Sequence, residues 1–183
     1  MLDAGTRADA GLATFGLSAW RFDQREIIIN ALQGRSSVVM APTGSGKTLC
    51  FALPAHVLHA ERQATTVVIS PLLALIREQV LKWQALKIPA CALNSTTKPS
   101  VRGEILRALE SADAKQARYA LLYTTPETLQ SQDVRKALAA CNAQGRLALI
   151  AVDEAHCSKP SPPPPPPPTI MQFCGNLTLV PPL

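Results

Sequence analysis

Short apolar runs recur along the chain, separated by longer stretches of mixed apolar and polar residues. Within each run the apolar residues follow one another without strict alternation, which is the pattern of strands covered on both faces. Such strands are typical of parallel sheets, whose helical crossovers pack on both sides. Five runs are predicted to form strands: Ser37–Met40, Thr66–Ser70, Ala90–Leu93, Tyr119–Tyr123 and Leu147–Val152.

The stretches between these runs carry apolar residues at helical spacing, with capping residues before them and glycines after them. Strands that alternate with helices of this length predict an α/β fold with a parallel sheet flanked by helices. Residues 1–14 show no strong periodicity, and we expect a flexible lead there. The first predicted helix begins near Ser18 and ends at Gly34, and the last begins at Ser131 and ends at Gly145. Two further helices are predicted to begin after Pro71 and at Ser100.

Composition narrows the class of protein. The 183 residues are 47% hydrophobic and 17% charged, which excludes a wholly disordered chain. No run reaches the roughly 18 uninterrupted apolar residues of a membrane span, and Met1–Trp20 lacks the pattern of a secretory signal. The sequence therefore predicts a soluble, intracellular protein with no membrane partner. Its net charge of +5 permits nucleic-acid binding without arguing for it.

Cysteines and histidines give little support for a metal site. The five cysteines include no CxxC pair, so a disulfide framework or a structural zinc site is not expected. His56 and His59 lie one helical turn apart, but a third ligand is not nearby in the sequence. We interpret them as ordinary helix residues.

The composition changes at Cys157, where a proline-rich low-complexity segment, residues 158–183, begins. Pro162–Pro168 must adopt extended polyproline II and cannot join the interior of a helix or sheet. We expect a disordered tail that is a spacer or an artefact of gene structure. The alternative is a ligand for a polyproline-binding partner with an aromatic groove.

The segment Ala41–Thr48, APTGSGKT, follows a predicted strand and opens a helix, which is the context of a phosphate-binding loop (P-loop). Its backbone N–H groups, from Thr43, Gly44, Ser45 and Gly46 onward, would surround a phosphate beside the positive end of the helix. Lys47 would reach the β- and γ-phosphates, and the Thr48 hydroxyl would hold Mg²⁺. The usual pattern begins with Gly where this chain has Ala41, and the alternative is a chance Gly-Ser turn.

A second half of a nucleotide site follows the apolar strand Leu147–Val152. Open α/β sheets bind ligands at the carboxyl ends of their strands, where Asp153 and Glu154 come next. Asp153 could hold the Mg²⁺ and its water shell, and Glu154 could orient and deprotonate an attacking water. A solvated acidic turn is the alternative. Together with the P-loop, the pair predicts a nucleoside triphosphate site.

Six motifs occur in order between residues 15 and 157. They are Phe15–Gln24 (FGLSAWRFDQ), Ala41–Thr48 (APTGSGKT), Ser70–Val80 (SPLLALIREQV), Ala92–Ser95 (ALNS), Tyr123–Glu127 (YTTPE) and Asp153–Cys157 (DEAHC). This combination resembles the first RecA-like domain of the RecQ-family DNA helicases of superfamily two. The resemblance divides the chain into a lead (1–14), an ATP-binding domain (15–157) and a tail (158–183).

The resemblance implies that Arg21 and Gln24 contact adenine, so that the nucleotide is ATP. A glutamine side chain offers the donor and the acceptor that an adenine edge requires. Two departures from the family pattern weaken this pocket. Leu17 stands where many members place an aromatic residue or histidine over the base, and Phe22-Asp23 replaces a pair that usually begins with proline.

The family moves 3′ to 5′ along one DNA strand, separates duplexes, and acts in repair and recombination. By resemblance, Ser70, Asn94, Ser95 and Thr125 would contact the sugar-phosphate backbone of DNA, although each is equally suited to cap a helix. His156 would couple the ATP site to the DNA side.

The resemblance stops after Cys157, where the family continues with a motif III strand and a second lobe that carries an arginine finger. We therefore expect a truncated ATP-binding lobe that is inactive alone; the alternative is a non-catalytic isoform that acts through its prolines. In the family the motif III strand lies between the P-loop strand and the acidic strand, and we do not expect Leu177–Val180 to replace it. By analogy with the family, and because a proline homopolymer points to a eukaryotic gene, we expect a nuclear protein; the alternative is a cytoplasmic one. The oligomeric state stays open.

Overall fold

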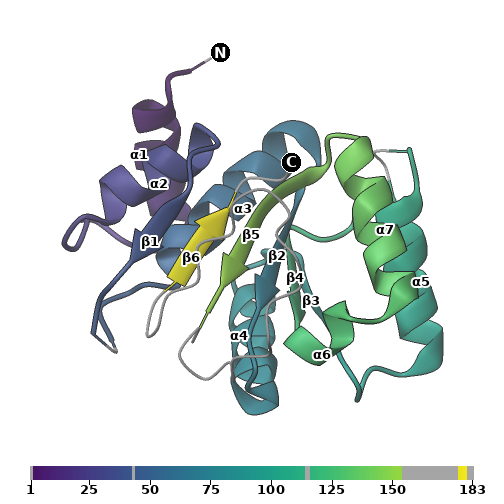
Figure 1. Ribbon diagram of the computed structural model, residues 1–183. Helices are drawn as coiled ribbons and strands as arrows, with labels where there is room; N and C mark the ends of the chain where they lie inside the picture. The colour runs from purple at the N-terminus through teal and green to yellow at the C-terminus, as the bar shows by residue number, and fades with distance from the viewer. Residues whose placement is uncertain (1, 43, 114–115, 154–176, 181–183) are drawn as a thin grey trace.

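The computed structural model describes residues 2–42, 44–113, 116–153 and 177–180 (Figure 1). In this part of the chain, six strands form one sheet in the order β1-β6-β5-β2-β4-β3. The strands β5, β2, β4 and β3 pair in parallel, and β6 is antiparallel to both of its neighbours. The predicted α/β class is confirmed. The strands are β1 Ser37–Val39, β2 Thr65–Ile69, β3 Ala90–Leu93, β4 Leu121–Thr124, β5 Leu147–Val152 and β6 Leu177–Val180.

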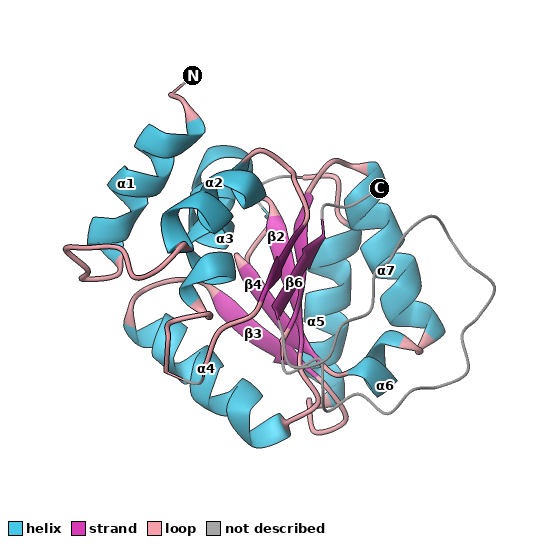
Figure 2. Ribbon diagram, turned by 60° about the vertical axis from the view of Figure 1, so that its left-hand side comes forward, coloured by secondary structure: helices cyan, strands magenta, loops and turns pink. Residues whose placement is uncertain are grey.

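Helices cover both faces of the sheet (Figure 2). The first four pack on one face, and α5 and α7 pack on the other. None of the helices in the described ranges is long and apolar enough to cross a membrane. Their bounds are α1 Ala4–Thr14, α2 Gln24–Leu32, α3 Leu49–Arg62, α4 Leu73–Ala85, α5 Pro99–Glu110, α6 Pro126–Leu129 and α7 Gln132–Ala143.

The core has two parts because successive side chains of a strand point to opposite faces of the sheet. Val68 packs with the α1–α4 side, whereas its neighbour Val67 packs with α5 and α7. In β4, Leu121 and Tyr123 belong to the first cluster and Leu122 to the second. Strands buried on both faces explain why the sequence shows continuous apolar runs instead of alternation.

The five predicted strands are all present, with ends within two residues of the predicted ones. The predicted helix ends at Gly34 and Gly145 are confirmed, since both glycines have positive φ angles, 72° and 67°, just beyond α2 and α7. Ser131 occupies the predicted N-cap position of α7. Two predicted starts are wrong: α2 begins at Gln24 and not near Ser18, and Ser100 lies inside α5, which Pro99 opens.

The expectation of a flexible lead over residues 1–14 is also wrong, because Ala4–Thr14 forms helix α1. Asp3 caps this helix by accepting hydrogen bonds from the backbone N–H groups of Gly5 and Thr6. Ala8 and Leu12 are buried against the α2–α3 side of the core. Three of the four buried residues of α1 are small (Gly5, Ala8 and Gly11), so the buried face of the helix is hard to recognise in the sequence.

The expectation that Leu177–Val180 stays out of the sheet is wrong as well. These residues form β6, which pairs with β1 on one side and β5 on the other. Four residues pair with two strands that are distant in sequence, and single-sequence patterns do not contain that information. The rest of the predicted proline-rich tail lies outside the described residues.

Candidate functional site

The carboxyl ends of the strands bring the predicted site residues to one edge of the sheet. Because β1, β5, β2, β4 and β3 point the same way, the segments that follow them meet at this edge. The sheet order places the P-loop and Asp153 toward one end of this edge and the predicted DNA contacts toward the other. In sheet order, the segments that follow β1, β5, β2, β4 and β3 begin at Met40, Asp153, Ser70, Thr125 and Asn94.

The P-loop turns through two glycines with left-handed backbone, Gly44 (φ 81°) and Gly46 (φ 89°). The ammonium group of Lys47 donates to the carbonyls of Ala41 (2.6 Å) and Pro42 (3.1 Å). In this arrangement the ammonium group that the sequence assigns to phosphate is held by the loop's own backbone carbonyls. A phosphate group would have to replace these carbonyls, which it can do because it offers a full negative charge.

The side chain of Gln24 is hydrogen-bonded to the backbone of the P-loop. Its side chain is 6% exposed, and its Nε2 donates to the carbonyls of Gly46 (3.1 Å) and Ser45 (3.4 Å). Its Oε1 accepts from the backbone N–H of Arg21 at 2.9 Å. A Cβ placed on Gly46 would lie 2.5 Å from Gln24 Nε2, so glycine is required for this approach. The motif at the start of α2 and the P-loop therefore form one hydrogen-bonded unit.

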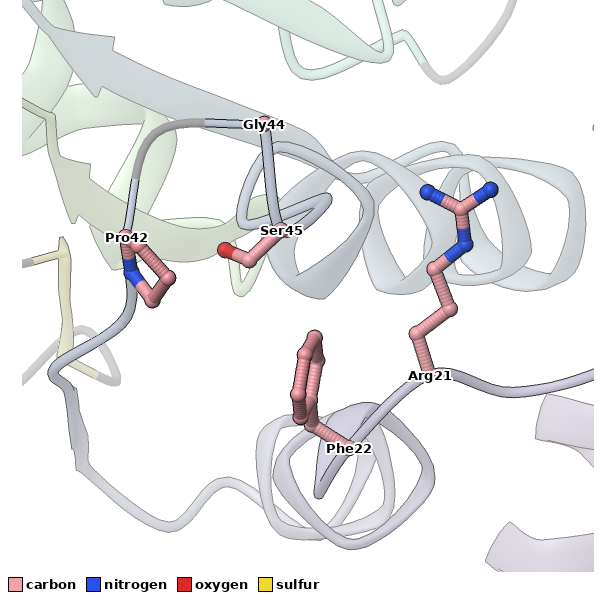
Figure 3. Close-up of a pocket in the computed structure, with 5 residues that line it drawn as sticks. All are labelled: Arg21, Phe22, Pro42, Gly44 and Ser45. Carbon is pink, nitrogen blue, oxygen red and sulfur yellow. The ribbon is translucent and has the colours of Figure 1, made fainter.

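An open cavity of about 520 Å³ lies between this motif and the P-loop (Figure 3). Arg21 and Phe22 line it from the α2 side, and Pro42, Gly44 and Ser45 from the P-loop side. The Phe22 ring points toward the P-loop and is 80% exposed, on a backbone with a φ of 48°. Phe22 belongs to one of the two departures from the family pattern in the predicted adenine motif, and the structure places its ring at the mouth of this cavity.

Two smaller cavities adjoin this one. One of about 160 Å³ lies under the P-loop and is lined by Lys47 and Cys50 among others. Burial raises the pKa of the Cys50 thiol to about 11, which makes it an uncharged wall. The other, of about 330 Å³, is lined by Leu17, Arg21 and Gln24, the three residues that the sequence assigns to the adenine pocket. Its remaining lining residues are Phe15, Ala19, Gly46, Thr48, Leu49, Lys82, Trp83 and Leu86. The structure thus brings these residues together beside the P-loop.

Asp153 stands at the end of β5, and its backbone N–H donates to the carbonyl of Ile69 at 2.9 Å. Thr48 lies at the N-cap position of α3 and is half-buried. A hydroxyl and a carboxylate are the oxygen ligands that Mg²⁺ prefers. The described residues hold no cluster of three or more His, Cys, Asp or Glu side chains that could bind a metal ion. The donor set therefore fits an Mg²⁺ ion that takes its remaining ligands from phosphates and water.

Three predicted site residues, Thr43, Glu154 and His156, lie outside the described part of the chain. The other two histidines have local contacts. His56 packs edge-on against Phe15, and His59 Nδ1 lies 3.0 Å from the carbonyl of Ala64.

The four predicted DNA contacts, Ser70, Asn94, Ser95 and Thr125, differ in burial and in the hydrogen bonds of their side chains. Thr125 caps α6 by accepting from the N–H of Thr128 at 3.3 Å, so the capping alternative is confirmed for it. Asn94 Oδ1 accepts from the backbone N–H and the hydroxyl of Thr96. The Ser70 hydroxyl is buried and has no hydrogen-bond partner among the described residues, and Ser95 is exposed. Of the four, Ser95 is the most accessible to a ligand.

A cavity of about 400 Å³ lies beside these residues, between α4 and the loop after β3. Leu73 and Arg77 line it from α4, and Asn94, Thr96 and Thr97 from the loop. Arg77, within the motif Ser70–Val80, supplies an exposed positive charge and was not among the predicted DNA contacts. Its position one helical turn after Leu73 marks it as part of the same helix face.

Comparison with known proteins decides the family. The model of the DEAD/DEAH box helicase family matches residues 21–161, which is most of the chain. The chain belongs to the DEAD/DEAH box helicase family. The matched residues of this DEAD/DEAH box helicase domain include the P-loop and the Asp153–His156 motif.

Curated relatives of this helicase domain confirm the predicted resemblance to RecQ-family DNA helicases. The chain is 40% identical over 150 residues to "ATP-dependent DNA helicase Q-like 2" of Arabidopsis thaliana, which covers 81% of the chain and 20% of the relative. It is 36% identical over 157 residues to "ATP-dependent DNA helicase RecQ" of Synechocystis sp., which covers 86% of the chain and 30% of the relative. The chain thus spans less than a third of the length of either relative.

Solved structures of helicases share the fold of this helicase domain. The structure of the DUF1998 helicase MrfA bound to DNA and AMPPNP matches with a TM-score of 0.67 at 22% identity, over 85% of this chain and 22% of that one. A hypothetical ATP-dependent RNA helicase from Sulfolobus tokodaii matches with a TM-score of 0.51 at 19% identity, over 73% and 37% of the two chains. The likeness supports the RecA-like fold predicted from the sequence.

Proposed function

We propose that this chain binds ATP with Mg²⁺ as the first RecA-like lobe of a RecQ-type 3′–5′ DNA helicase. The observation that carries the proposal is the pairing of Gln24 with the P-loop carbonyls of Ser45 and Gly46. It joins the motif that would select adenine to the loop that would bind phosphate. A chance Gly-Ser turn would not require such a partner.

Each residue would then have one task. The Lys47 ammonium would leave the carbonyls of Ala41 and Pro42 and bind the β- and γ-phosphates. Thr48 and Asp153 would hold Mg²⁺, which neutralises phosphate charge when bound. Glu154 would orient the attacking water and accept its proton.

The base would lie in the cavity lined by Leu17, Arg21 and Gln24. Arg21 can stack its guanidinium plane on a base, and Leu17 offers apolar contact in place of aromatic stacking. We expect a preference for adenine at a looser affinity than an aromatic residue would give.

DNA would follow the other end of the same sheet edge. Ser95 and Arg77 present a hydroxyl and a positive charge beside the cavity between α4 and the β3 loop. Backbone contacts of this kind position a strand without selecting a sequence.

Nucleotide binding tests the first half of the proposal. In a titration with a fluorescent ATP analogue and Mg²⁺, Lys47→Ala should cost roughly 1.5–3 kcal/mol of binding free energy, since it removes a charge-assisted contact. Lys98→Ala is the matched control, because Lys98 is exposed just before α5. Equal affinities of the two variants would show that Lys47 does not bind phosphate. Competition with unlabelled ATP and GTP then measures adenine preference.

Single-stranded DNA binding tests the second half. Arg77→Ala should lower the slope of log affinity against log salt by about 1, because one phosphate contact is lost. Arg35→Ala removes the same charge from the opposite edge of the sheet, before β1, and should leave the slope unchanged. The same response to both variants would place the DNA elsewhere.

A further inference from the structure

Strand β6 is the one link between the P-loop strand and the rest of the sheet in the described part of the chain. It pairs with β1 through three residues and with β5 through three residues. β1 pairs with no other strand there, and it does not pair with β5 directly. The P-loop follows β1 and Asp153 follows β5, so β6 lies between the two halves of the proposed nucleotide site.

The register of β6 places the carboxyl ends of β1 and β5 within one residue of each other. Thr178 lies opposite Val38 of β1 and opposite Val152 of β5. One step along, Leu179 lies opposite Ser37 and Ala151. β1 therefore runs one residue further than β5, with Val39 opposite Leu177. The backbone of β6 thus meets both strands at the point where each one ends and its functional segment begins.

The strand also sets a distance. Neighbouring strands lie roughly 4.8 Å apart, so one inserted strand holds β1 and β5 at about twice that separation. If β6 left, β1 would lose its strand partner, or it would move by about one strand spacing to pair with β5. Either change would displace the P-loop relative to Asp153.

We propose that β6 is a positioning strand for the nucleotide site, which sets the separation between the P-loop with Lys47 and Thr48 and the carboxylate of Asp153. The role in nucleotide binding rests on the function proposed above, whereas the pairing of β6 does not. The connection between β5 and β6 is compatible with this position of β6. An antiparallel neighbour of β5 needs no crossover helix, and 24 residues lie between Val152 and Leu177.

Amide hydrogen exchange of the full chain tests the pairing without any nucleotide. The amides of Ser37–Val39 should include protected ones, because β1 has β6 as its strand neighbour in the described residues. Their exchange at the rate of exposed backbone, alongside protected amides in β2 and β4, would overturn the proposal. Failure of nucleotide binding in the wild-type chain would contradict the proposed function and leave this result standing.

Two proline variants test the positioning role. Thr178→Pro and Leu179→Pro each remove one N–H, and successive N–H groups of a strand point to opposite neighbours. One variant should release the amides of β1 and the other those of β5, while β3 and β4 stay protected. Thr178→Val is the matched control, because it keeps the backbone donor and should retain wild-type protection.

Nucleotide affinity completes the test. With Mg²⁺, the proline variants should bind the fluorescent ATP analogue about tenfold more weakly or worse, since Thr48 and Asp153 no longer share an ion. With excess EDTA, their affinity should equal that of the wild type. An equal loss under both conditions, or no loss in Mg²⁺, would overturn the positioning role. If a proline variant also loses protection in β3 and β4, the exchange pattern of the wild type and of Thr178→Val decides the pairing.

Discussion

The indole Nε1 of Trp83 donates a hydrogen bond of 2.7 Å to the phenol oxygen of Tyr123, and each residue is 1% exposed. The bond joins α4 to β4 across the core. Burial raises the pKa of Tyr123 most strongly. The Trp83 hydrogen bond opposes this shift, and the negative charge of Asp153 adds a smaller upward effect on the pKa. The phenol is therefore neutral at every physiological pH. Trp83 also lines the cavity assigned to adenine, so this bond fixes one wall of the site.

Removal of either partner of this bond should destabilise the fold. Tyr123→Phe leaves a buried indole N–H unpaired, which costs about 1–3 kcal/mol. Trp83→Phe adds the loss of apolar volume. In the double variant the two effects should be less than additive, because no unpaired polar group remains. Urea unfolding of the four proteins measures the coupling.

Tyr119→Phe is the control for this cycle. Tyr119 is half-buried, and its phenol makes no hydrogen bond within the described residues. Its replacement should change stability by less than Tyr123→Phe does. Strict additivity of the Trp83 and Tyr123 effects would show that the bond contributes nothing.

The sequence predicts best the elements whose pattern is local and strong. β3 and β5 begin and end where their apolar runs do. Helix α1 was missed because its buried positions include Gly5, Ala8 and Gly11, which differ little from exposed small residues. The placement of Leu177–Val180 between β1 and β5 was predicted wrongly because a strand-like run of four residues does not indicate which strands it pairs with.

The candidate site also has parts that the sequence predicts and parts that depend on packing. Spacing alone identifies Ala41–Thr48, since glycines, lysine and threonine must follow one another to surround a phosphate. The contact between Gln24 and this loop depends on how α2 packs, so the sequence predicted the residue but not its partners. Phe22 and Arg77 lie within motifs that the sequence identifies, but their places in the cavity walls depend on loop and helix geometry that the motifs do not contain.

The two described histidines should make the protein less stable in acid. Burial lowers the pKa of His56 and of His59 below the ordinary value of 6.5, and the charge of His59 lowers that of His56 further. Between the lowered pKa values and 6.5 the unfolded chain binds more protons than the folded one, so stability rises with pH. We expect a lower urea midpoint at about pH 5.5 than at about pH 7.5.

Substitution of these histidines identifies their share of the acid effect. His56→Gln and His59→Gln should each reduce the difference between the two midpoints, and the double variant should reduce it most. An unchanged difference in the double variant would assign the acid effect to other groups.

Gly46→Ala should weaken nucleotide binding through Gln24. Two effects act at this position: the φ of 89° is costly for alanine, and the new Cβ would lie 2.5 Å from Gln24 Nε2. Because that atom is the end of a flexible side chain, Gln24 can move away, at the expense of its hydrogen bonds to Ser45 and Gly46. Gly34→Ala is the matched control, since Gly34 has a φ of 72° and open space around its Cβ position. Both variants should lose roughly 1 kcal/mol of stability from backbone strain, but only Gly46→Ala should also lose affinity for the fluorescent ATP analogue. Adding Gln24→Ala to Gly46→Ala should then cost little further affinity, because the same contact is already broken. A full additional loss in that double variant would show that Gln24 acts on the nucleotide independently of the P-loop.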